Sequence, residues 1–205
     1  MEEKLRDEII YALDKYVGNI ARIRNETKRR ISWDDYFISI ATIVATRATC
    51  LRRGYGAIIV DPDSHLIIST GYCGNAPKTP NCFGELNICF REKAKIPSGI
   101  LYNLCKSVHA EENAIMYAGK EKCRGKAIYV SGFDWETRKL VSGKPCFGCE
   151  TKIITAGLEE IIYLDDEKKI IRKKVKDIIG ERRKNPFIEQ ERELETLKEK
   201  GFKLE

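Results

Sequence analysis

The feature that most constrains this chain is a pair of short motifs, His-Ala-Glu at residues 109–111 and Pro-Cys-Phe-Gly-Cys at residues 145–149. Each motif stands where the apolar pattern predicts the start of a helix, and residues 127–130 between them read as a buried strand. The chain contains only 2 histidines and 8 cysteines, so a histidine that binds metal is nearly identified by elimination. A fold that unites the two helix starts would set one imidazole beside two thiols.

Those three side chains have the chemistry of a catalytic zinc site. Zinc prefers four tetrahedral ligands, and a catalytic zinc takes three from the protein and leaves the fourth position to water. We expect His109, Cys146 and Cys149 to be the three ligands. Cysteines near the start of a helix lie at the positive end of its dipole, which favours the thiolate, and Pro145 suits the opening position of the helix.

Glu111 is expected to be the catalytic acid and base. Zinc lowers the pKa of bound water from ~15.7 toward ~7. We expect Glu111 to protonate a ring nitrogen of the substrate, to take a proton from the water and to deliver it to the leaving ammonia. Proton transfer of this kind accelerates a reaction by ~10²–10⁴-fold. An H-x-E motif followed by P-C-x-x-C is the signature of zinc-dependent nucleobase deaminases. The alternative is an ordinary buried histidine with a redox pair of cysteines.

Patterns in the first 70 residues predict helices followed by a hairpin. Residues 1–31 mix charge with apolar residues spaced by three or four, which predicts an amphipathic helical extension that packs on the domain or on a partner subunit. Ser32 followed by Asp35 is a capping-box pattern for a helix that runs to about Thr46. Two strands, at 57–60 and 66–70, flank a turn.

The second half alternates helices and strands, which predicts helices that cover a sheet. Helices are expected to begin near His109 and at 145–146, the second ending before Gly157, and a strand is expected at 161–164. From 165 onward the chain is charged. There we expect a helix at 168–175, a break at 185–186, a closing helix at 189–200 and an edge strand at 202–204. The resulting division is a helical extension at 1–31, a catalytic domain at 32–164 and charged C-terminal helices at 165–205.

The charge and the apolar pattern narrow the class of protein. The net charge of +6 arises from 37 basic and 31 acidic residues, a modest excess that suits an enzyme of a small phosphate ester and leaves nucleic-acid binding open. No apolar stretch approaches the ~18 residues of a membrane span, and the N-terminus has no signal-peptide pattern. We therefore expect a cytoplasmic protein, in which free cysteines serve metal binding better than disulfides.

Five segments make the chain resemble the deoxycytidylate (dCMP) deaminase branch of the zinc-dependent cytidine deaminase superfamily. The resemblance implies a three-layer α/β fold, with a mixed sheet of about five strands covered by helices on both faces. It also implies hydrolysis of dCMP to dUMP and ammonia, and a homo-oligomer, hexamer or dimer. The segments are 32–37 (SWDDYF), 49–60 (TCLRRGYGAIIV), 71–72 (GY), 109–115 (HAEENAI) and 145–149 (PCFGC).

The same resemblance implies a second, structural zinc. Some members of that branch hold one with cysteines before the first strand, at the end of the loop after the Gly-Tyr pair, and before the catalytic histidine. Zinc would order a loop otherwise too long to stay structured, and the alternative is that these cysteines are small buried apolar residues. The corresponding residues here are Cys50, Cys82, Cys89 and Cys105, whereas Cys73 and Cys123 are expected to be unliganded.

The chain also departs from that branch. Cys73 stands where members commonly carry an asparagine expected to contact the sugar, and residues 133–144 insert a long hairpin-like loop that could reshape the pocket. Arg52, Arg53 and Lys78 are candidates for binding the phosphate, with a solvated surface as the alternative. Two other functions stay open. One is deamination of nucleic acid, a transfer-RNA adenosine or a single-stranded cytosine, favoured by basic residues at 168–174 and 182–184; the other is a non-catalytic zinc-binding competence or regulatory protein.

Overall fold

The structure, a computed structural model, describes residues 2–96 and 100–201. By its contacts the chain divides into two units, Met1–Tyr36 and Phe37–Glu205. The first unit contains helix α1 (Glu2–Thr27), where the spacing of apolar residues predicts a helix, and the start of α2 (Trp33–Ala45). The finer division at 31 and 164 stays a prediction.

The start of α2 forms the predicted capping box. The backbone N–H of Asp35 donates to Ser32 Oγ at 3.0 Å, and the Ser32 hydroxyl donates to Asp35 Oδ2 at 2.6 Å. These bonds satisfy a backbone donor that has no partner inside the helix. The local sequence therefore sets where α2 begins.

The second unit is built on a six-stranded mixed sheet, counted over the described residues. The strand order is β2-β1-β5-β7-β8, and β6 pairs with β5. Only β5 and β7 pair in parallel; the other pairs are antiparallel. The predicted hairpin at 57–70 is confirmed, and the 133–144 insertion forms a hairpin. The strands are β1 (Arg53–Val60), β2 (Ile67–Tyr72), β5 (Ala127–Asp134), β6 (Lys139–Val141), β7 (Glu160–Leu164) and β8 (Ile170–Lys174).

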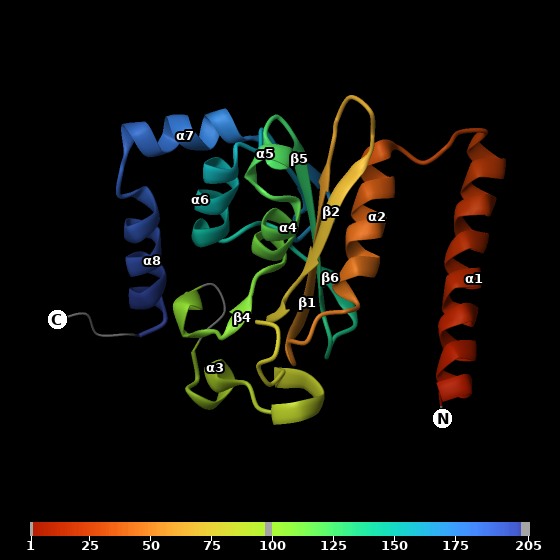
Figure 1. Ribbon diagram of the computed structural model, residues 1–205, viewed down its shortest axis with the longest axis horizontal. Helices are drawn as coiled ribbons and strands as arrows, with labels where there is room; N and C mark the ends of the chain where they lie inside the picture. Colours follow the sequence, from red (N-terminus) through yellow and green to blue (C-terminus); the bar gives the residue numbers. More distant parts are fainter. Residues whose placement is uncertain (1, 97–99, 202–205) are drawn as a thin grey trace. The chain divides into compact units, whose positions relative to one another are not determined.

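Helices cover both faces of this sheet, as predicted. In Figure 1 the sheet lies between α2 on one side and α4 (Ala110–Ala118) and α6 (Phe147–Ala156) on the other, with α7 (Val175–Lys184) beside α6. Alternate residues of each central strand enter opposite apolar clusters, which is the period of two that a strand imposes. The strand residues on the α4 and α6 side are Ala57, Ile59, Ile128, Val130, Ile161 and Tyr163, and those on the α2 side are Ile58, Val60, Ala127, Tyr129, Ile162 and Leu164.

The predicted helix at 168–175 is wrong: β8 occupies most of that segment and pairs antiparallel with β7. A period of two, rather than 3.6, sorts its charges. Arg172 and Lys174 lie on one face, and both form ion pairs with Glu160, while Lys173 points to the opposite face and reaches Glu150 of α6. Each of these three charged side chains of the edge strand therefore has an ion-pair partner, on β7 for one face and on α6 for the other. A helix with this spacing could not place the three side chains in this way.

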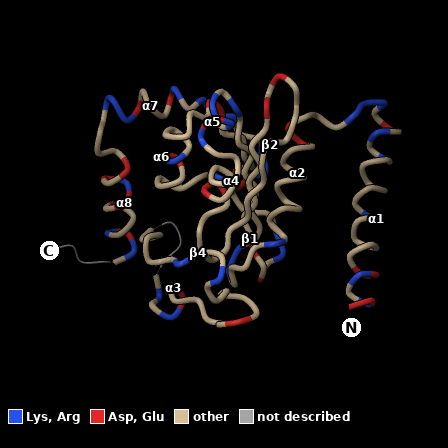
Figure 2. The backbone as a smooth tube through the Cα atoms, in the orientation of Figure 1, with Lys and Arg blue, Asp and Glu red and all other residues tan. Residues whose placement is uncertain are grey.

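The remaining elements are short or terminal. The break at 185–186 is confirmed, because Asn185 ends α7 and α8 (Ile188–Glu199) follows. Figure 2 shows both signs of charge along α7 and α8. The predicted strand at 202–204 lies outside the described residues. None of the described helices combines the length and the apolar composition that a membrane crossing requires. The other elements are β3 (Gly74–Asn75), η1 (Cys82–Leu86), α3 (Phe90–Lys93), η2 (Tyr102–Leu104), β4 (Ser107–Val108) and α5 (Lys120–Cys123).

Gly71 lets β2 approach α4 closely. A Cβ at Gly71 would stand 2.3 Å from the Ala114 nitrogen and 2.4 Å from the Ala110 oxygen, both of them backbone atoms. We expect Gly71→Ala to destabilise the domain by ~1–3 kcal/mol, because overpacking forces backbone to move. Chemical denaturation measures this against Gly18→Ala, a position with nothing within 4 Å. An unchanged midpoint for Gly71→Ala would contradict the close packing.

Candidate metal centre and active site

Three potential metal ligands meet at the starts of two helices. His109 Nδ1 lies 3.5 Å from Cys146 Sγ and 3.3 Å from Cys149 Sγ. The ligand atoms of the three residues all lie within 4.8 Å of one another, and no other group of three or more such side chains does so among the described residues. A tetrahedral zinc with Zn–S of ~2.3 Å and Zn–N of ~2.0–2.1 Å keeps its ligand atoms roughly 3.5–3.8 Å apart. The donor set and its spacing therefore fit zinc.

The backbone explains why these side chains converge. His109 is the N-cap of α4 and Cys146 is the N-cap of α6, both with extended backbone, at ψ 156 and ψ 165. Cys149 follows within the first turn of α6. Because α4 and α6 pack on the same face of the sheet, their first residues lie side by side. Pro145 precedes the cap and lies two positions before Phe147, the first residue of α6, so it does not take the opening position that we expected.

The two thiols and the imidazole share protons. The hydrogen bond from Cys149, and then the one with His109, lowers the pKa of Cys146 to about 4. The hydrogen bond with Cys146, together with burial, raises the pKa of Cys149. Burial lowers the pKa of His109, but the hydrogen bond with Cys146 and the charge of Glu111 outweigh it and raise this pKa. The lowered pKa of Cys146 favours its thiolate, the form that zinc binds.

Glu111 is a buried carboxyl group beside this cluster. It is 5% exposed, and its burial raises its pKa, an effect that the positive charge of His109 partly opposes. A carboxyl group with a raised pKa retains its proton closer to neutral pH. Glu111 is therefore suited to give a proton and to take one back.

The cluster opens into a pocket whose empty space, open solvent included, is about 830 Å³. His109, Glu111 and Cys146 line the pocket, and among the described residues Glu111 is the one acidic residue in its lining. The basic residues in the lining are Arg52, Arg53, Arg91 and Lys144.

Two of the three predicted phosphate-binding residues lie at this pocket. Arg52 pairs with Glu92 at 3.2 Å, and Arg53 pairs with Asp134 at 3.6 Å. Lys78 is not among the residues that line the pocket, so its role stays a prediction.

Sequence reasoning missed two basic residues of the lining. Arg91 is 5% exposed, donates to the carbonyl oxygens of Ile100 and Leu101 at 2.7 and 2.5 Å, and lies 4.9 Å from the centre of the Tyr102 ring. Lys144 comes from the end of the 133–144 insertion, which thus contributes to the pocket as predicted. No local pattern distinguishes these two residues from other basic residues, because only the fold brings their segments to the site.

The four remaining candidate ligands lie near one another without reaching ligand spacing. Cys50, Cys89 and Cys105 line the same pocket. Burial raises the pKa of Cys82, and negative charge on Cys50, Cys105 or Cys89 would raise it further, so the four thiols are close enough to interact electrostatically. No three of them lie as close as the His109 group. The second zinc therefore stays a prediction.

Cys73, in the place of the asparagine, contacts backbone instead of other thiols. Its sulfur accepts a hydrogen bond from the Tyr55 N–H at 3.2 Å and donates to the Arg53 carbonyl oxygen at 3.6 Å. Burial raises the pKa of Cys73 to about 12. The side chain therefore remains a neutral thiol at neutral pH.

One histidine and two cysteines at neighbouring helix starts, with a buried carboxyl group beside them on a mixed sheet, define the class of zinc-dependent deaminases. The chain belongs to the family described as the cytidine and deoxycytidylate deaminase zinc-binding region, whose model matches residues 31–165. The resemblance that the motifs carry is thereby confirmed.

Named relatives lie in the same family. The deoxycytidylate deaminase of Schizosaccharomyces pombe is 32% identical over 143 residues, 70% of this chain and 40% of that protein. The deoxycytidylate deaminase of Mycobacterium phage D29 is 32% identical over 139 residues, 65% of this chain and 95% of that protein. The chain thus spans about two fifths of the fungal relative and nearly all of the phage one.

The similarity to solved structures is lower. The dCMP deaminase of cyanophage S-TIM5 in its apo form superposes with a TM-score of 0.42 at 21% identity, over 62% of this chain and 79% of that one. A superposition at this level says nothing about function.

Proposed function

We propose that this chain is a zinc-dependent hydrolase that removes the amino group of a cytosine nucleotide, with dCMP as the substrate and dUMP and ammonia as the products. The observation that carries the proposal is the meeting of His109, Cys146 and Cys149 beside the buried Glu111. The deoxycytidylate deaminases among the relatives support the choice of substrate.

The protein's own residues would move the protons of this reaction. Zinc, when bound, lowers the pKa of a water from ~15.7 toward ~7. His109, Cys146 and Cys149 would hold the metal. Glu111, with its raised pKa, would protonate the ring nitrogen next to the amino carbon, accept the proton of the attacking water and pass it to the leaving amino group. The carbon–oxygen bond forms first and the carbon–nitrogen bond then breaks. The second proton of the water returns to Glu111, so the carboxyl group is restored and water is the only co-reactant.

Ammonia release from a panel of substrates tests the function. We expect the zinc-loaded chain to act on dCMP with a higher kcat/KM than on dCTP, deoxycytidine, cytidine or a cytosine-containing oligonucleotide. Preference for the oligonucleotide, with binding that weakens steeply in salt, would favour the nucleic-acid alternative. Inactivity on the whole panel would remove the enzyme proposal.

Basic side chains around the pocket support a phosphorylated substrate. We expect Arg52→Gln to raise KM for dCMP roughly 10-fold or more, because a charge-assisted hydrogen bond contributes ~1.5–3 kcal/mol, and to leave KM for deoxycytidine nearly unchanged. Steady-state kinetics with both substrates measures this. Arg47→Gln is the matched control, since Arg47 is exposed and lies outside the pocket lining. An equal loss on both substrates would argue against a phosphate contact.

The second zinc is retained as a proposal. Its support is that Cys50, Cys89 and Cys105 line one pocket, and that negative charge on any of these three would raise the pKa of Cys82. Metal analysis of the purified chain tests it. Two zinc ions per chain, falling to one in Cys82→Ser, would support the site; one zinc ion in both would oppose it.

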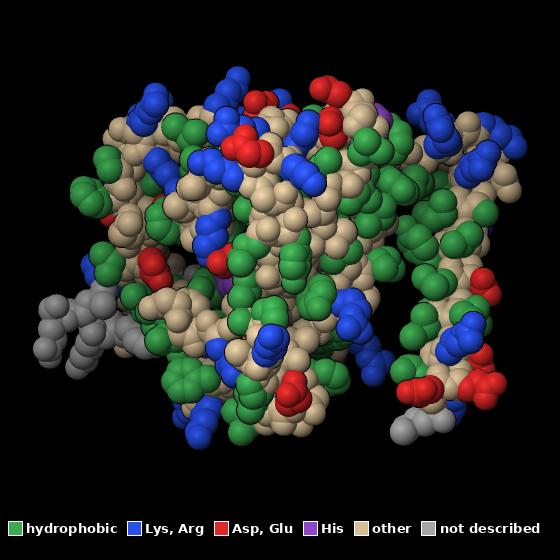
Figure 3. All heavy atoms as spheres, viewed as in Figure 1, with side chains coloured by type: hydrophobic (Ala, Val, Ile, Leu, Met, Phe, Trp, Pro, Cys, Tyr) green, Lys and Arg blue, Asp and Glu red, His purple; other side chains and the backbone are tan. Residues whose placement is uncertain are grey.

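We also propose that the chain assembles with copies of itself through α1. None of the residues of α1 is buried, and Figure 3 shows hydrophobic side chains gathered along one side of it. Ile9, Leu13, Tyr16, Ile20 and Ile23 follow the alternating spacing of four and three that coiled coils use. Loss of the oligomer in Leu13→Asp, measured by light scattering, would support this assembly.

We also propose a cellular compartment for this protein, from the state of its cysteines. All eight cysteines are free, and a site that uses thiolates needs them reduced. We place the enzyme in the cytoplasm, where reductants maintain that state.

A further inference from the structure

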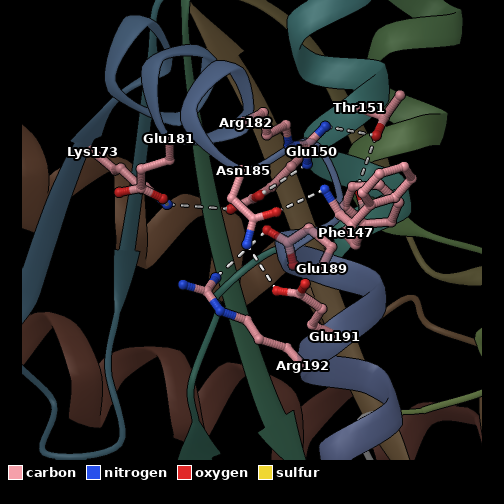
Figure 4. Close-up of polar contacts among 11 residues, drawn as sticks. Phe147, Glu150, Thr151, Lys173, Glu181, Arg182, Asn185, Glu189, Glu191 and Arg192 are labelled. Carbon is pink, nitrogen blue, oxygen red and sulfur yellow. Dashed lines mark hydrogen bonds and ion pairs between the residues drawn. The ribbon is translucent and has the colours of Figure 1, made fainter.

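A single arginine of the C-terminal segment contacts the helix start that carries both cysteine ligands. The Arg182 guanidinium group of α7 lies 4.4 Å from the centre of the Phe147 ring. Its Nη1 donates to Thr151 Oγ1 at 3.0 Å, and its Nη2 donates to Glu150 Oε2 at 3.2 Å (Figure 4). Phe147 lies between Cys146 and Cys149 in the chain, so these contacts span the turn that positions the two sulfurs.

Glu150 ties this turn to the sheet edge as well. Its side chain is 5% exposed and forms ion pairs with Arg182 at 3.2 Å and with Lys173 of β8 at 3.6 Å. A buried carboxylate is tolerated only where cations and hydrogen bonds compensate it. The backbone N–H of Glu150 also donates to the Cys146 carbonyl oxygen at 2.9 Å, the first helical bond of α6. The residue after one cysteine ligand is thus fixed from two neighbouring elements.

The start of α6 has no hydrogen bond from an oxygen-bearing cap side chain. Its N-cap is Cys146, which makes no side-chain capping hydrogen bond, and a sulfur committed to a metal cannot cap the helix as Ser or Asp would. Gly148 lies in the same turn and adds backbone freedom. Unsupported first turns fray, and fraying here would separate the ligands.

We propose that Arg182 is a positioning residue of the metal centre, which holds the first turn of α6 so that Cys146 and Cys149 keep the spacing that zinc requires. This inference rests on the metal site of the proposed function. It assigns a role to the charged C-terminal segment, because Arg182 and Lys173 both lie beyond residue 165, where the family match ends.

Zinc release from the full chain tests the proposal without relying on catalysis. We expect Arg182→Met to release zinc to a chromophoric chelator about 10–100-fold faster than the parent, if a loss of metal affinity of the size caused by removing an outer partner of a ligand appears in the release rate. Arg182→Lys keeps the positive charge near Glu150 but loses the flat, forked contact with Phe147 and Thr151. Its zinc release rate should therefore lie between those of the parent and of Arg182→Met. Arg183→Met, on an exposed neighbour in the same helix, should match the parent.

A second readout separates positioning from stability. The absorption spectrum of the cobalt-substituted protein reports ligand geometry, and we expect it to change in Arg182→Met and not in Arg183→Met. Arg182→Met keeps Lys173 beside Glu150, so the carboxylate is not left alone. A lower Tm with unchanged zinc release and an unchanged cobalt spectrum would overturn the proposal, because Arg182 would then only stabilise the fold.

Failure of this inference can be distinguished from failure of the proposed function. A chain that binds zinc, releases it faster as Arg182→Met and deaminates nothing would remove the enzyme proposal and leave this inference in place. A parent chain that binds no zinc at His109, Cys146 and Cys149 would overturn both.

Discussion

Glu111→Gln is expected to lower kcat on dCMP by ~10²–10⁴-fold or more, the contribution of a general acid and base. Glutamine has nearly the same shape but can neither give a proton to the ring nitrogen nor take one from water. Because Glu111 is not among the grouped metal ligands, we expect the variant to keep its zinc. Ammonia release and metal content, measured on the same sample, check both parts.

A neighbouring acid provides the control. Glu112 is paired with Lys152 at 2.6 Å and does not line the pocket, so Glu112→Gln should retain kcat within a few-fold. Full activity of Glu111→Gln would contradict the assigned role. Loss of zinc from Glu111→Gln would show that the carboxyl group supports the metal instead of moving protons.

Cys149→Ala is expected to abolish activity by removing the metal. The side chain is 1% exposed and is one of the three proposed protein ligands, so its loss should weaken zinc binding by more than the ~10–100-fold that an outer partner contributes. Zinc stoichiometry by metal analysis, together with kcat, measures the effect. The parent treated with a strong chelator should become equally inactive and should recover when zinc is restored.

Cys123→Ala distinguishes the lost ligand from a cavity. Cys123 is as deeply buried, at 0% exposed, but does not belong to the His109 group of potential ligands. This control should keep its zinc and its activity, with only a modest loss of stability. Retention of zinc and activity by Cys149→Ala would rule out the proposed ligand set.

The local pattern of apolar and turn residues was sufficient to predict most of the fold. The strands at 57–60, 127–130 and 161–164 have short apolar runs between turn residues, and each forms a strand. The helix predicted at 168–175 was wrong, because two adjacent isoleucines among basic residues are as compatible with a helix as with an edge strand. Antiparallel pairing with the preceding strand, β7, decided it, and this pairing sets Glu160 opposite Lys174.

The candidate site likewise has features that the sequence predicted and features that only the fold decided. Its ligand types follow from the motifs, since a C-x-x-C spacing places two sulfurs on one helical turn. The basic residues around the pocket do not: Arg52 was expected, but Arg91 and Lys144 come from segments that only the fold brings to the pocket.

By itself the sequence determined the family of this protein and its candidate metal ligands, because ligand type, spacing within a turn and helix-start signals are local properties of a few adjacent residues. The tertiary structure alone decided that His109 meets the two cysteines, that burial raises the pKa of Glu111, and that Arg182 contacts the turn between the sulfurs. These features depend on contacts between residues far apart in the chain, and packing on a common sheet brings such residues together.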